Sequence, residues 1–151
     1  MTAIHAIKAY TLEGAITEDT DFSDYLGAPG EVLRLDLSGV TRINSCGVRE
    51  WLNFVRAVEA SGGRVILERC SSAIVGQLNL IYNFTGKQGE VCSVLAPYAC
   101  DDCGHEEDRL LELEAGADVE ALTGPSDCPG CDAQMEFADL PDYYLQFYVL
   151  G

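Results

Sequence analysis

Four of the seven cysteines have a spacing that suits a metal ion. They form two pairs, Cys100 with Cys103 and Cys128 with Cys131, and two residues separate the cysteines of each pair. Thiolates at this spacing can bind one ion from a single tight turn, and two such turns provide the tetrahedral set that Zn²⁺ favours. The sequence therefore predicts one structural Zn²⁺ per chain, with these four cysteines as its ligands.

The 24 residues between the two pairs slightly exceed the usual spacing of zinc modules. This segment has room for the hairpin of a zinc ribbon, because residues 109–118 have the pattern of a strand ending in a glycine turn and 133–140 that of a return strand. Gly104, directly after the second cysteine, suits a tight turn. We therefore expect a zinc-ribbon-like β module over residues 100–138. Two alternatives stay open, namely reduced thiols without a metal and a CxxC redox pair.

A catalytic zinc site is a further alternative, because HEE at 105–107 followed by CPGC superficially resembles the signature of zinc deaminases. In that signature a proline precedes the first cysteine of the pair, whereas Pro129 follows it here, and Cys100 and Cys103 would have no role. Four thiolates also leave no coordination position open for a water molecule. We therefore expect His105 at the surface beside the metal, and no enzymatic activity.

A second group of functional side chains lies where an alternating apolar segment ends and a helical pattern begins. Its residues are Asn44, Ser45, Cys46 and Gly47. Asn is a good N-cap, and a helix that begins here offers free backbone N–H groups and the positive end of its dipole. Asn44 and Ser45 are therefore expected to cap this helix. We expect Cys46 to fill a small apolar space and Gly47 to allow close packing.

Acidic residues are concentrated in the C-terminal third. Residues 1–99 have eight Lys or Arg and eleven Asp or Glu, whereas residues 100–151 have one basic residue, Arg109, and fourteen acidic ones. Nucleic-acid binding requires basic groups that displace counterions from phosphates, so this third would repel a nucleic acid, and an anionic membrane likewise. We interpret it as a solubilising face or as a surface that meets a basic patch of a partner.

The remaining composition is that of a folded protein. A length of 151 residues with 48% hydrophobic residues suffices for one domain with a small module. No stretch approaches 18 uninterrupted apolar residues, so membrane insertion is not expected. The start of the sequence lacks the basic flank and apolar core of a secretion signal. Together with the odd number of cysteines, these features predict a cytoplasmic protein without a disulfide framework.

The elements that must position both groups alternate between strand and helix. Apolar patterns predict one or two strands within 4–16 and single strands at 31–40, 64–70 and 90–100. Capping residues and periodicity predict three helices: a short one within 18–30, one from Val48 that ends at Ser61-Gly62-Gly63, and one capped by Ser71. This order predicts an α/β sheet with helices mainly on one side. Trp51, Cys70 and Cys92 are expected in its core.

A final helix is predicted at the C-terminus, over residues 139–150, with Pro141 in its first turn. Leu140, Tyr144, Phe147 and Tyr148 would form one apolar face of this helix. We expect this face to pack on the sheet. The alternative is that it forms a homodimer contact or a surface for another partner.

The N-terminal part resembles the STAS domain, named for sulfate transporters and anti-sigma factor antagonists. The resemblance is carried by LDLSGV at 35–40, NSCG at 44–47, SGG at 61–63 and FTG at 84–86, in that order. It covers most of residues 1–99 and extends to the last helix, 139–151. The resemblance implies a mixed β-sheet with helices mainly on one face, beside the module of residues 100–138.

The family implies a non-enzymatic signalling or adaptor protein. Ser45 stands where regulated STAS proteins have their phosphoacceptor, whereas Asn44 replaces the family's Asp and Cys46 its usual Ser or Thr. A phosphate there would be held by the free N–H groups of the helix start and would add nearly two negative charges. The resemblance thus implies that Ser45 is a phosphorylated, partner-contacting residue, and the alternative is that Asn44 and Ser45 only cap the helix. By this resemblance the chain is an anti-anti-sigma factor that binds an anti-sigma-type Ser/Thr kinase through the loop and helix starting at Ser45. The alternative is a constitutive subunit of a larger assembly, such as a transporter ATPase complex, with no phosphoswitch.

Overall fold

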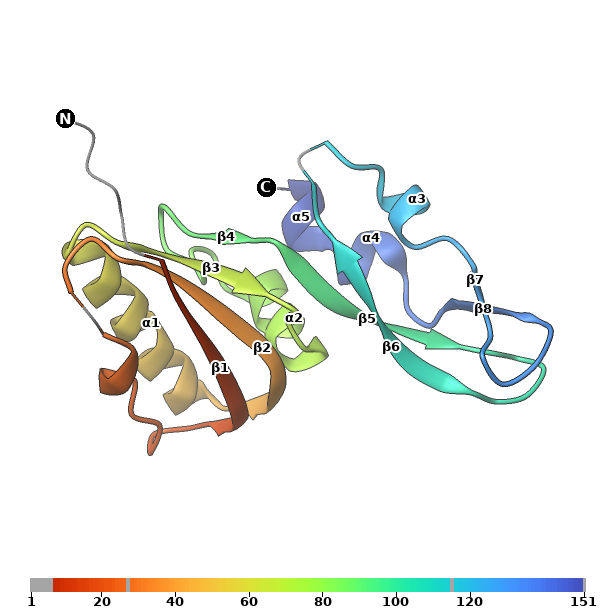
Figure 1. Cartoon of the computed structure of the whole chain (residues 1–151), viewed down its shortest axis with the longest axis horizontal. Coiled ribbons are helices and arrows are strands. Elements are labelled where there is room, and N and C mark those ends of the chain that lie inside the picture. The colour runs from red at the N-terminus through yellow and green to blue at the C-terminus, as the bar shows by residue number, and fades with distance from the viewer. Residues whose placement is uncertain (1–6, 27, 115, 151) are drawn as a thin grey trace.

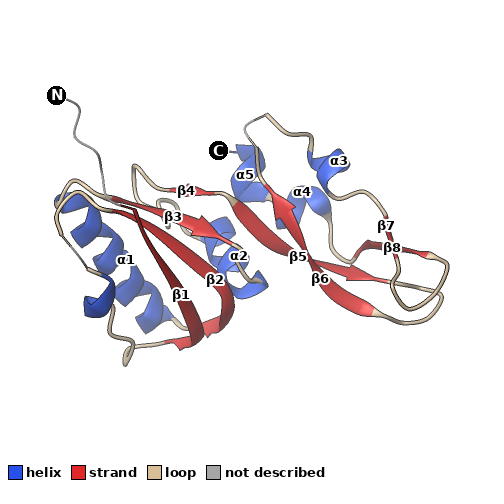
Figure 2. Ribbon diagram, viewed as in Figure 1, coloured by secondary structure: helices blue, strands red, loops and turns tan. Residues whose placement is uncertain are grey.

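The computed structural model describes residues 7–26, 28–114 and 116–150, and this part of the chain forms two β-sheets with helices against them (Figures 1 and 2). The predicted α/β class is confirmed. Residues 4–6 of the first predicted strand, and Gly151 of the last predicted helix, lie outside the described residues. The first sheet has four parallel strands in chain order: β1 (Ile7–Ile16), β2 (Val32–Ile43), β3 (Arg64–Glu68) and β4 (Glu90–Val91).

Two helices, α1 (Ser45–Ala60) and α2 (Ser72–Leu80), pack against this parallel sheet. Leucines at alternate positions of β2 are buried in one core with Trp51 of α1, whereas Arg34 between them is exposed. The Trp51 indole N–H donates a hydrogen bond to the carbonyl oxygen of Phe84 at 2.8 Å, so this buried aromatic ring has a polar partner. The short helix predicted within 18–30 is a single 3₁₀ turn, η1 (Ser23–Tyr25).

The second sheet is antiparallel, and its strands lie in the order β6-β5-β8-β7. Their bounds are β5 (Ser93–Ala99), β6 (Glu106–Glu112), β7 (Ser126–Asp127) and β8 (Gln134–Phe137). The strands expected within 109–118 and 133–140 therefore exist, but they do not pair with each other, because β5 lies between them. A tight turn joins β5 directly to β6, and neighbours in sequence pair most readily.

The mixed sheet that we expected is thus two sheets, one parallel and one antiparallel. The connections from β1 to β4 cross over through α1, α2 or the segment containing η1, and such crossovers make adjacent strands parallel. Short turns in the second half allow antiparallel pairing instead. The single strand expected at 90–100 is likewise divided between the two sheets, into β4 and β5.

Backbone hydrogen bonds around Cys92 join the two sheets. The Cys92 N–H donates to the Leu67 carbonyl of β3 at 2.7 Å, and the Cys92 carbonyl accepts from Leu113 at 2.8 Å. Beside it, Cys70 and Val94 form an isolated parallel bridge. The chain therefore passes from the parallel to the antiparallel sheet without a free linker.

The C-terminal helix is divided into α4 (Pro141–Tyr144) and α5 (Gln146–Leu150), and a short α3 (Val119–Leu122) precedes β7. Pro141 occupies the first turn of α4, as predicted. The interruption at Leu145 has a cause in α2, because the Asn79 amide donates to the Tyr144 carbonyl at 2.9 Å and accepts from the Phe147 N–H at 2.9 Å. Backbone groups that could continue the helix are paired with Asn79 instead.

The last helices touch both halves of the molecule. The Tyr144 hydroxyl donates to the Leu95 carbonyl of β5, whereas Asn79 belongs to α2 beneath the parallel sheet. Tyr144 and Leu145 are both buried. Tyr144 of the predicted apolar face therefore packs against β5, whereas Leu140 of the same face is 70% exposed. No helix in the described ranges is both long and apolar enough to cross a membrane.

Candidate functional site

The four paired cysteines meet beside the second sheet. Their sulfur atoms all lie within 4.8 Å of one another, with 3.6 Å between Cys100 and Cys131 and 3.6 Å between Cys103 and Cys128. A tetrahedral ion with Zn–S bonds of about 2.3 Å separates its sulfur ligands by about 3.8 Å. The sulfurs thus already have spacings close to those of a four-thiolate metal site.

The two cysteine turns have the same backbone construction. In the first, the Cys100 N–H donates to the His105 carbonyl at 2.8 Å; in the second, the Cys128 N–H donates to the Ala133 carbonyl at 3.0 Å. Each bond closes a loop of six residues around one CxxC pair. Gly104 has φ +77°, a left-handed conformation that a glycine adopts without strain, so its place after the second cysteine fits the turn.

Backbone N–H groups point at the sulfurs. Gly130 donates to Cys128 Sγ and Ala133 donates to Cys131 Sγ, both at 3.4 Å. Backbone hydrogen bonds, first from Cys103, lower the pKa of the Cys100 thiol to about 7. The Ala133 N–H also favours the thiolate of Cys131, but the hydrogen bond to Cys100 and burial outweigh it and raise the pKa of Cys131 to about 12. Without a metal, the thiols of Cys100 and Cys131 therefore lose their protons at different pH. A divalent cation, in contrast, favours the thiolate form of all four cysteines.

His105 lies outside the sulfur cluster. Its Nε2 atom is 3.0 Å from Glu107 Oε1, and Glu107 also pairs with Arg109 at 3.6 Å. Within the described ranges, the groups that could jointly hold a metal ion are the four cysteines alone. Their donor set is soft and complete, which fits Zn²⁺ in a closed structural site.

Ser45 lies at the first position of α1, and the predicted cap before it is confirmed. The Asn44 side-chain oxygen accepts the Gly47 N–H at 2.7 Å. Asn44, Ser45 and Cys46 are exposed, so the Ser45 hydroxyl is accessible at the positive end of a sixteen-residue helix. The cap and the exposed hydroxyl are compatible with both interpretations of Ser45.

Gly47 is buried against the end of β1. A Cβ atom at this position would lie 2.1 Å from the Ile16 carbonyl oxygen, so only glycine fits. The same carbonyl accepts the Asn44 N–H at 3.2 Å. The start of α1 is therefore held rigidly on the parallel sheet, and the close packing expected from Gly47 is confirmed.

Glu18 also belongs to this site, and no local sequence pattern indicated it. Asn44 Nδ2 donates to Glu18 Oε2 at 3.1 Å, which places a carboxylate beside the cap. A hydrogen bond from its own backbone N–H, and then this bond from Asn44, lower the pKa of Glu18. Glu18 follows β1, and Asn44 follows β2, which pairs with β1 in parallel. Only that pairing brings the two residues together across 26 positions of sequence.

The remaining cysteines divide by exposure. Cys46 is exposed, so the expectation that it fills a small apolar space is wrong. At the second position of α1 its side chain projects away from the sheet, whereas that of Gly47 would project into it. Cys70 is buried as predicted, and burial raises the pKa of its thiol well above the usual value. Cys92 is half-buried at the junction of the sheets.

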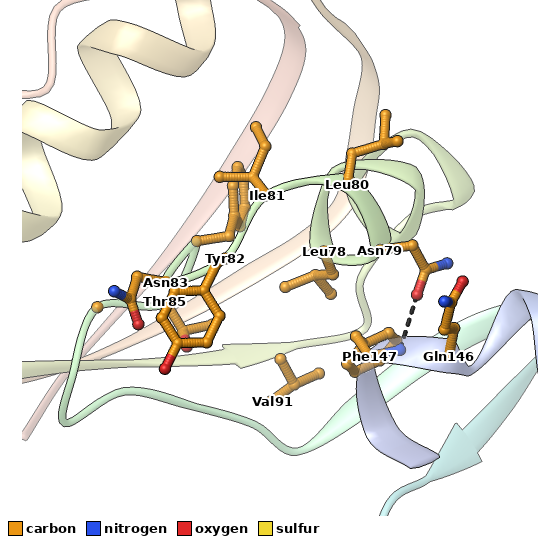
Figure 3. Close-up of a pocket in the computed structure, with 12 residues that line it drawn as sticks. Leu78, Asn79, Leu80, Ile81, Tyr82, Asn83, Thr85, Val91, Gln146 and Phe147 are labelled. Carbon is orange, nitrogen blue, oxygen red and sulfur yellow. Dashed lines mark hydrogen bonds between the residues drawn. The ribbon is translucent and has the colours of Figure 1, made fainter. Parts of the chain in front are cut away.

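A groove lies between the end of α2 and α5 (Figure 3). Its volume is about 450 Å³, and none of the described residues that line it is charged. Leu80 and Tyr82 project from its rim and are 79% and 91% exposed. At one end of the groove the Phe147 backbone N–H donates to the Asn79 side-chain oxygen, the bond drawn in Figure 3. The groove has the character of an apolar surface rather than of a catalytic site.

Comparison of the chain with protein-family models, with curated proteins and with solved structures gives no match. What the protein does is therefore argued from the geometry of two places. One is the sulfur cluster of the antiparallel sheet, and the other is the exposed start of α1.

Proposed function

We propose that the protein is a non-enzymatic interaction protein whose STAS-type parallel sheet presents the start of α1 to a protein partner. The observation that carries this proposal is the exposed Ser45 hydroxyl on a capped helix start that Gly47 packs tightly against β1. A rigid base with a small accessible hydroxyl suits a surface that a partner reads and that one modification can change.

We propose an anti-sigma-type Ser/Thr kinase as the partner, with Ser45 as its phosphoacceptor. A phosphate on Ser45 would meet the free N–H groups of the first turn of α1 and would add a charge of almost −2. A partner fitted to the neutral helix start would then be expelled by repulsion and by desolvation of the phosphate. In this scheme binding is released by modification and restored by its removal.

The second candidate is a constitutive subunit of a larger assembly, such as a transporter ATPase complex. One observation favours it: the carboxylate of Glu18 lies at the cap, bonded to Asn44. A phosphate on the neighbouring Ser45 would meet this negative charge, which disfavours the modified state. In this case the same surface contacts the partner at all times, and Ser45 is a helix-capping residue.

For the cysteine cluster we propose one structural Zn²⁺ per chain. The sulfur spacings, the matched turns and the N–H groups directed at sulfur support it. Four thiolates would complete a tetrahedral shell, which leaves no position for substrate or water, so the metal would hold the fold and perform no reaction. The acidic module around it would extend the partner surface towards a basic patch.

Affinity capture with three proteins distinguishes the two candidates. Wild type, Ser45→Asp and Ser45→Ala are used as baits, and bound proteins are identified by mass spectrometry together with the phosphorylation state of Ser45. For the switch, we expect wild type and Ser45→Ala to retain a kinase-fold partner that Ser45→Asp loses. Equal retention of an ATPase by all three baits would establish the constitutive subunit. A fourth bait, Arg49→Glu, alters the exposed start of α1 directly, and equal retention of every captured protein by this bait and by wild type would refute both candidates.

A further inference from the structure

The opposite end of α1 has a buried carboxylate without a counter-ion. Glu31, just before β2, is 9% exposed, and its Oε2 atom is fully buried without a hydrogen-bond partner among the described residues. Within the same ranges, no ion pair includes Glu31, and Arg64 nearby pairs with Glu90 instead. A buried, unpaired carboxylate oxygen is costly, so a partner for it is expected from outside the described residues.

Glu31 is one of the residues that line a small cavity. The cavity has a volume of about 180 Å³, and its other walls are mainly apolar: Leu26, Ala28, Leu33, Ala57, Val58 and Ser61. It is smaller than the roughly 300–1,000 Å³ of pockets for drug-sized ligands. A short aliphatic chain would fit these walls, and a nucleotide would not.

The C-terminal end of α1 is a second source of negative potential at this cavity. The helix ends at Ala60, and its last carbonyl groups are at the negative end of the helix dipole. No basic residue lies in its last turn. The Ser61 hydroxyl donates to the Val58 carbonyl at 2.7 Å, which leaves the hydroxyl oxygen able to accept. The carbonyl groups of Ala57, Val58 and Glu59 already accept N–H groups of residues 61–63, so the acceptors that remain at the cavity are the Glu31 carboxyl group and the Ser61 hydroxyl oxygen.

We propose that this cavity binds a primary ammonium group on a short aliphatic stem. The stem would lie against Leu33 and Val58, and the ammonium would donate to Glu31. The ammonium donors would meet the Glu31 carboxylate and the Ser61 hydroxyl oxygen, whereas a metal ion would need several more oxygens. The ammonium can come from a free alkylamine or from a lysine side chain of another protein. The site is separate from Ser45, at the far end of the same helix, and does not depend on the proposed partner.

Titrations followed by amide NMR of the full chain test this site. The probes are n-butylammonium, 1-butanol with the same stem but no charge, and Nα-acetyl-lysine methylamide. We expect butylammonium to shift the amides of Leu33, Val58 and Ser61, and to bind at least about tenfold more tightly than butanol. Tighter binding of the lysine derivative would assign the site to a protein lysine, and tighter binding of butylammonium to a small amine.

Variants identify the carboxylate as the determinant. Glu31→Gln keeps the shape of the side chain and should weaken butylammonium at least about tenfold. Asp24→Asn removes one exposed charge from the same part of the chain and should change nothing. Ala57→Leu fills the cavity without touching Glu31 and should abolish binding, which keeps the test valid if Glu31→Gln misfolds. Equal binding by wild type, Glu31→Gln and Ala57→Leu, or equal affinity for butanol, would overturn the proposal.

Discussion

The parallel and antiparallel halves of the molecule are stabilised by different means. In the parallel half, α1 and α2 bury long apolar side chains such as Trp51 and Phe54 against the sheet. In the antiparallel half, β7 has two residues and β8 four, and the buried set includes the cysteines Cys100 and Cys128. Strands as short as β7 and β8 bury little apolar surface by themselves, so we expect the proposed zinc site to contribute part of the stability of this half.

Charged residues are also distributed differently between the two halves. Residues 100–151 have fourteen acidic residues against one basic residue, whereas residues 1–99 are nearly balanced. Self-repulsion in the acidic half opposes its compact state. In the parallel half, ion pairs such as Arg34 with Glu68 at 2.7 Å instead lie on the open face of the sheet. The acidic half thus has the less favourable electrostatics, and we expect it to be the more dependent on its cysteines.

Loss of one cysteine ligand should have the largest effect and should fall on one half only. In Cys128→Ser one of the four ligands is missing, and we expect the bound zinc to fall from one per chain to almost none. The effect should be large because an intact structural site of this type contributes on the order of 10 kcal/mol. Hydrogen exchange should become fast in residues 100–138, while amides of β2 and β3 stay protected. Elemental analysis and hydrogen exchange measure the two effects.

Cys92→Ser is the matched control for this prediction, because Cys92 is a cysteine outside the sulfur cluster. It should retain a full complement of zinc. Unfolding of both halves in Cys128→Ser would show that the parallel sheet does not stand by itself. Full zinc binding by Cys128→Ser would refute the four-thiolate site.

A substitution at the start of α1 should destabilise the parallel half, in contrast to the loss of a cysteine ligand. Gly47→Ala introduces a Cβ atom 2.1 Å from the Ile16 carbonyl oxygen, so the helix or the strand must move. We expect a loss of about 3 kcal/mol in the free energy of unfolding. Denaturant titration of the Trp51 fluorescence measures it, because Trp51 is in the same core.

Gly76→Ala should change the free energy of unfolding in the opposite direction, within the same half of the molecule. Gly76 lies in α2, and a Cβ atom there would meet nothing within 4 Å. Alanine should therefore stabilise the protein by about 1 kcal/mol through helix propensity. Similar losses for both glycines would mean that backbone freedom, and not contact with Ile16, is what Gly47 provides.

Local patterns predicted the parallel half well. The alternation in β2, the apolar stripe of α1 and the glycines after it give each element a period and an end that neighbouring residues determine. The cysteine turns were predictable for the same reason, because each is a local structure of six residues. Asn44 was recognisable as a cap from its type and place alone.

Long-range contacts explain what the sequence did not indicate. The pairing of β5 between β6 and β8 depends on residues far apart in sequence, and no local period distinguishes it from a β6–β8 hairpin. The break at Leu145 depends on Asn79, more than sixty residues earlier in the chain. Glu18 reaches Asn44 only through parallel pairing of β1 with β2. In each case a tertiary partner overrides or adds to a local preference.

Asn79 connects the two halves, and its removal should weaken their contact. Asn79→Ala deletes the bonds to the Tyr144 carbonyl and the Phe147 N–H, which should cost about 2 kcal/mol. We expect faster hydrogen exchange in α4 and α5, with zinc content unchanged. Asn53→Ala, on the exposed face of α1, should leave this exchange as in wild type. Unchanged exchange in Asn79→Ala would mean that Tyr144 and Leu145 hold α4 without the amide.

The smallest effect is expected at the N-cap of α1. There the contribution of the Asn44 cap bond and that of Glu18 can be separated by their dependence on pH. Asn44→Ala removes the cap bond to Gly47 and should cost about 1 kcal/mol at any pH. It also removes the bond that helps to lower the pKa of Glu18, after the larger contribution of the Glu18 backbone N–H. NMR titration of the Glu18 carboxyl carbon should therefore give a higher pKa in Asn44→Ala than in wild type.

The sign of the pH dependence follows from that lowered pKa. A carboxyl whose pKa is lower in the folded than in the unfolded state stabilises the fold above its unfolded pKa, and this contribution is lost as pH falls through the folded pKa. The stability difference between wild type and Asn44→Ala should accordingly be largest above the ordinary Glu pKa of 4.5 and should shrink in acid towards the cap contribution alone. A difference that stays constant through this range would mean that Glu18 contributes nothing to the start of α1, and the negative charge beside Ser45 would then be free to move away from a phosphate.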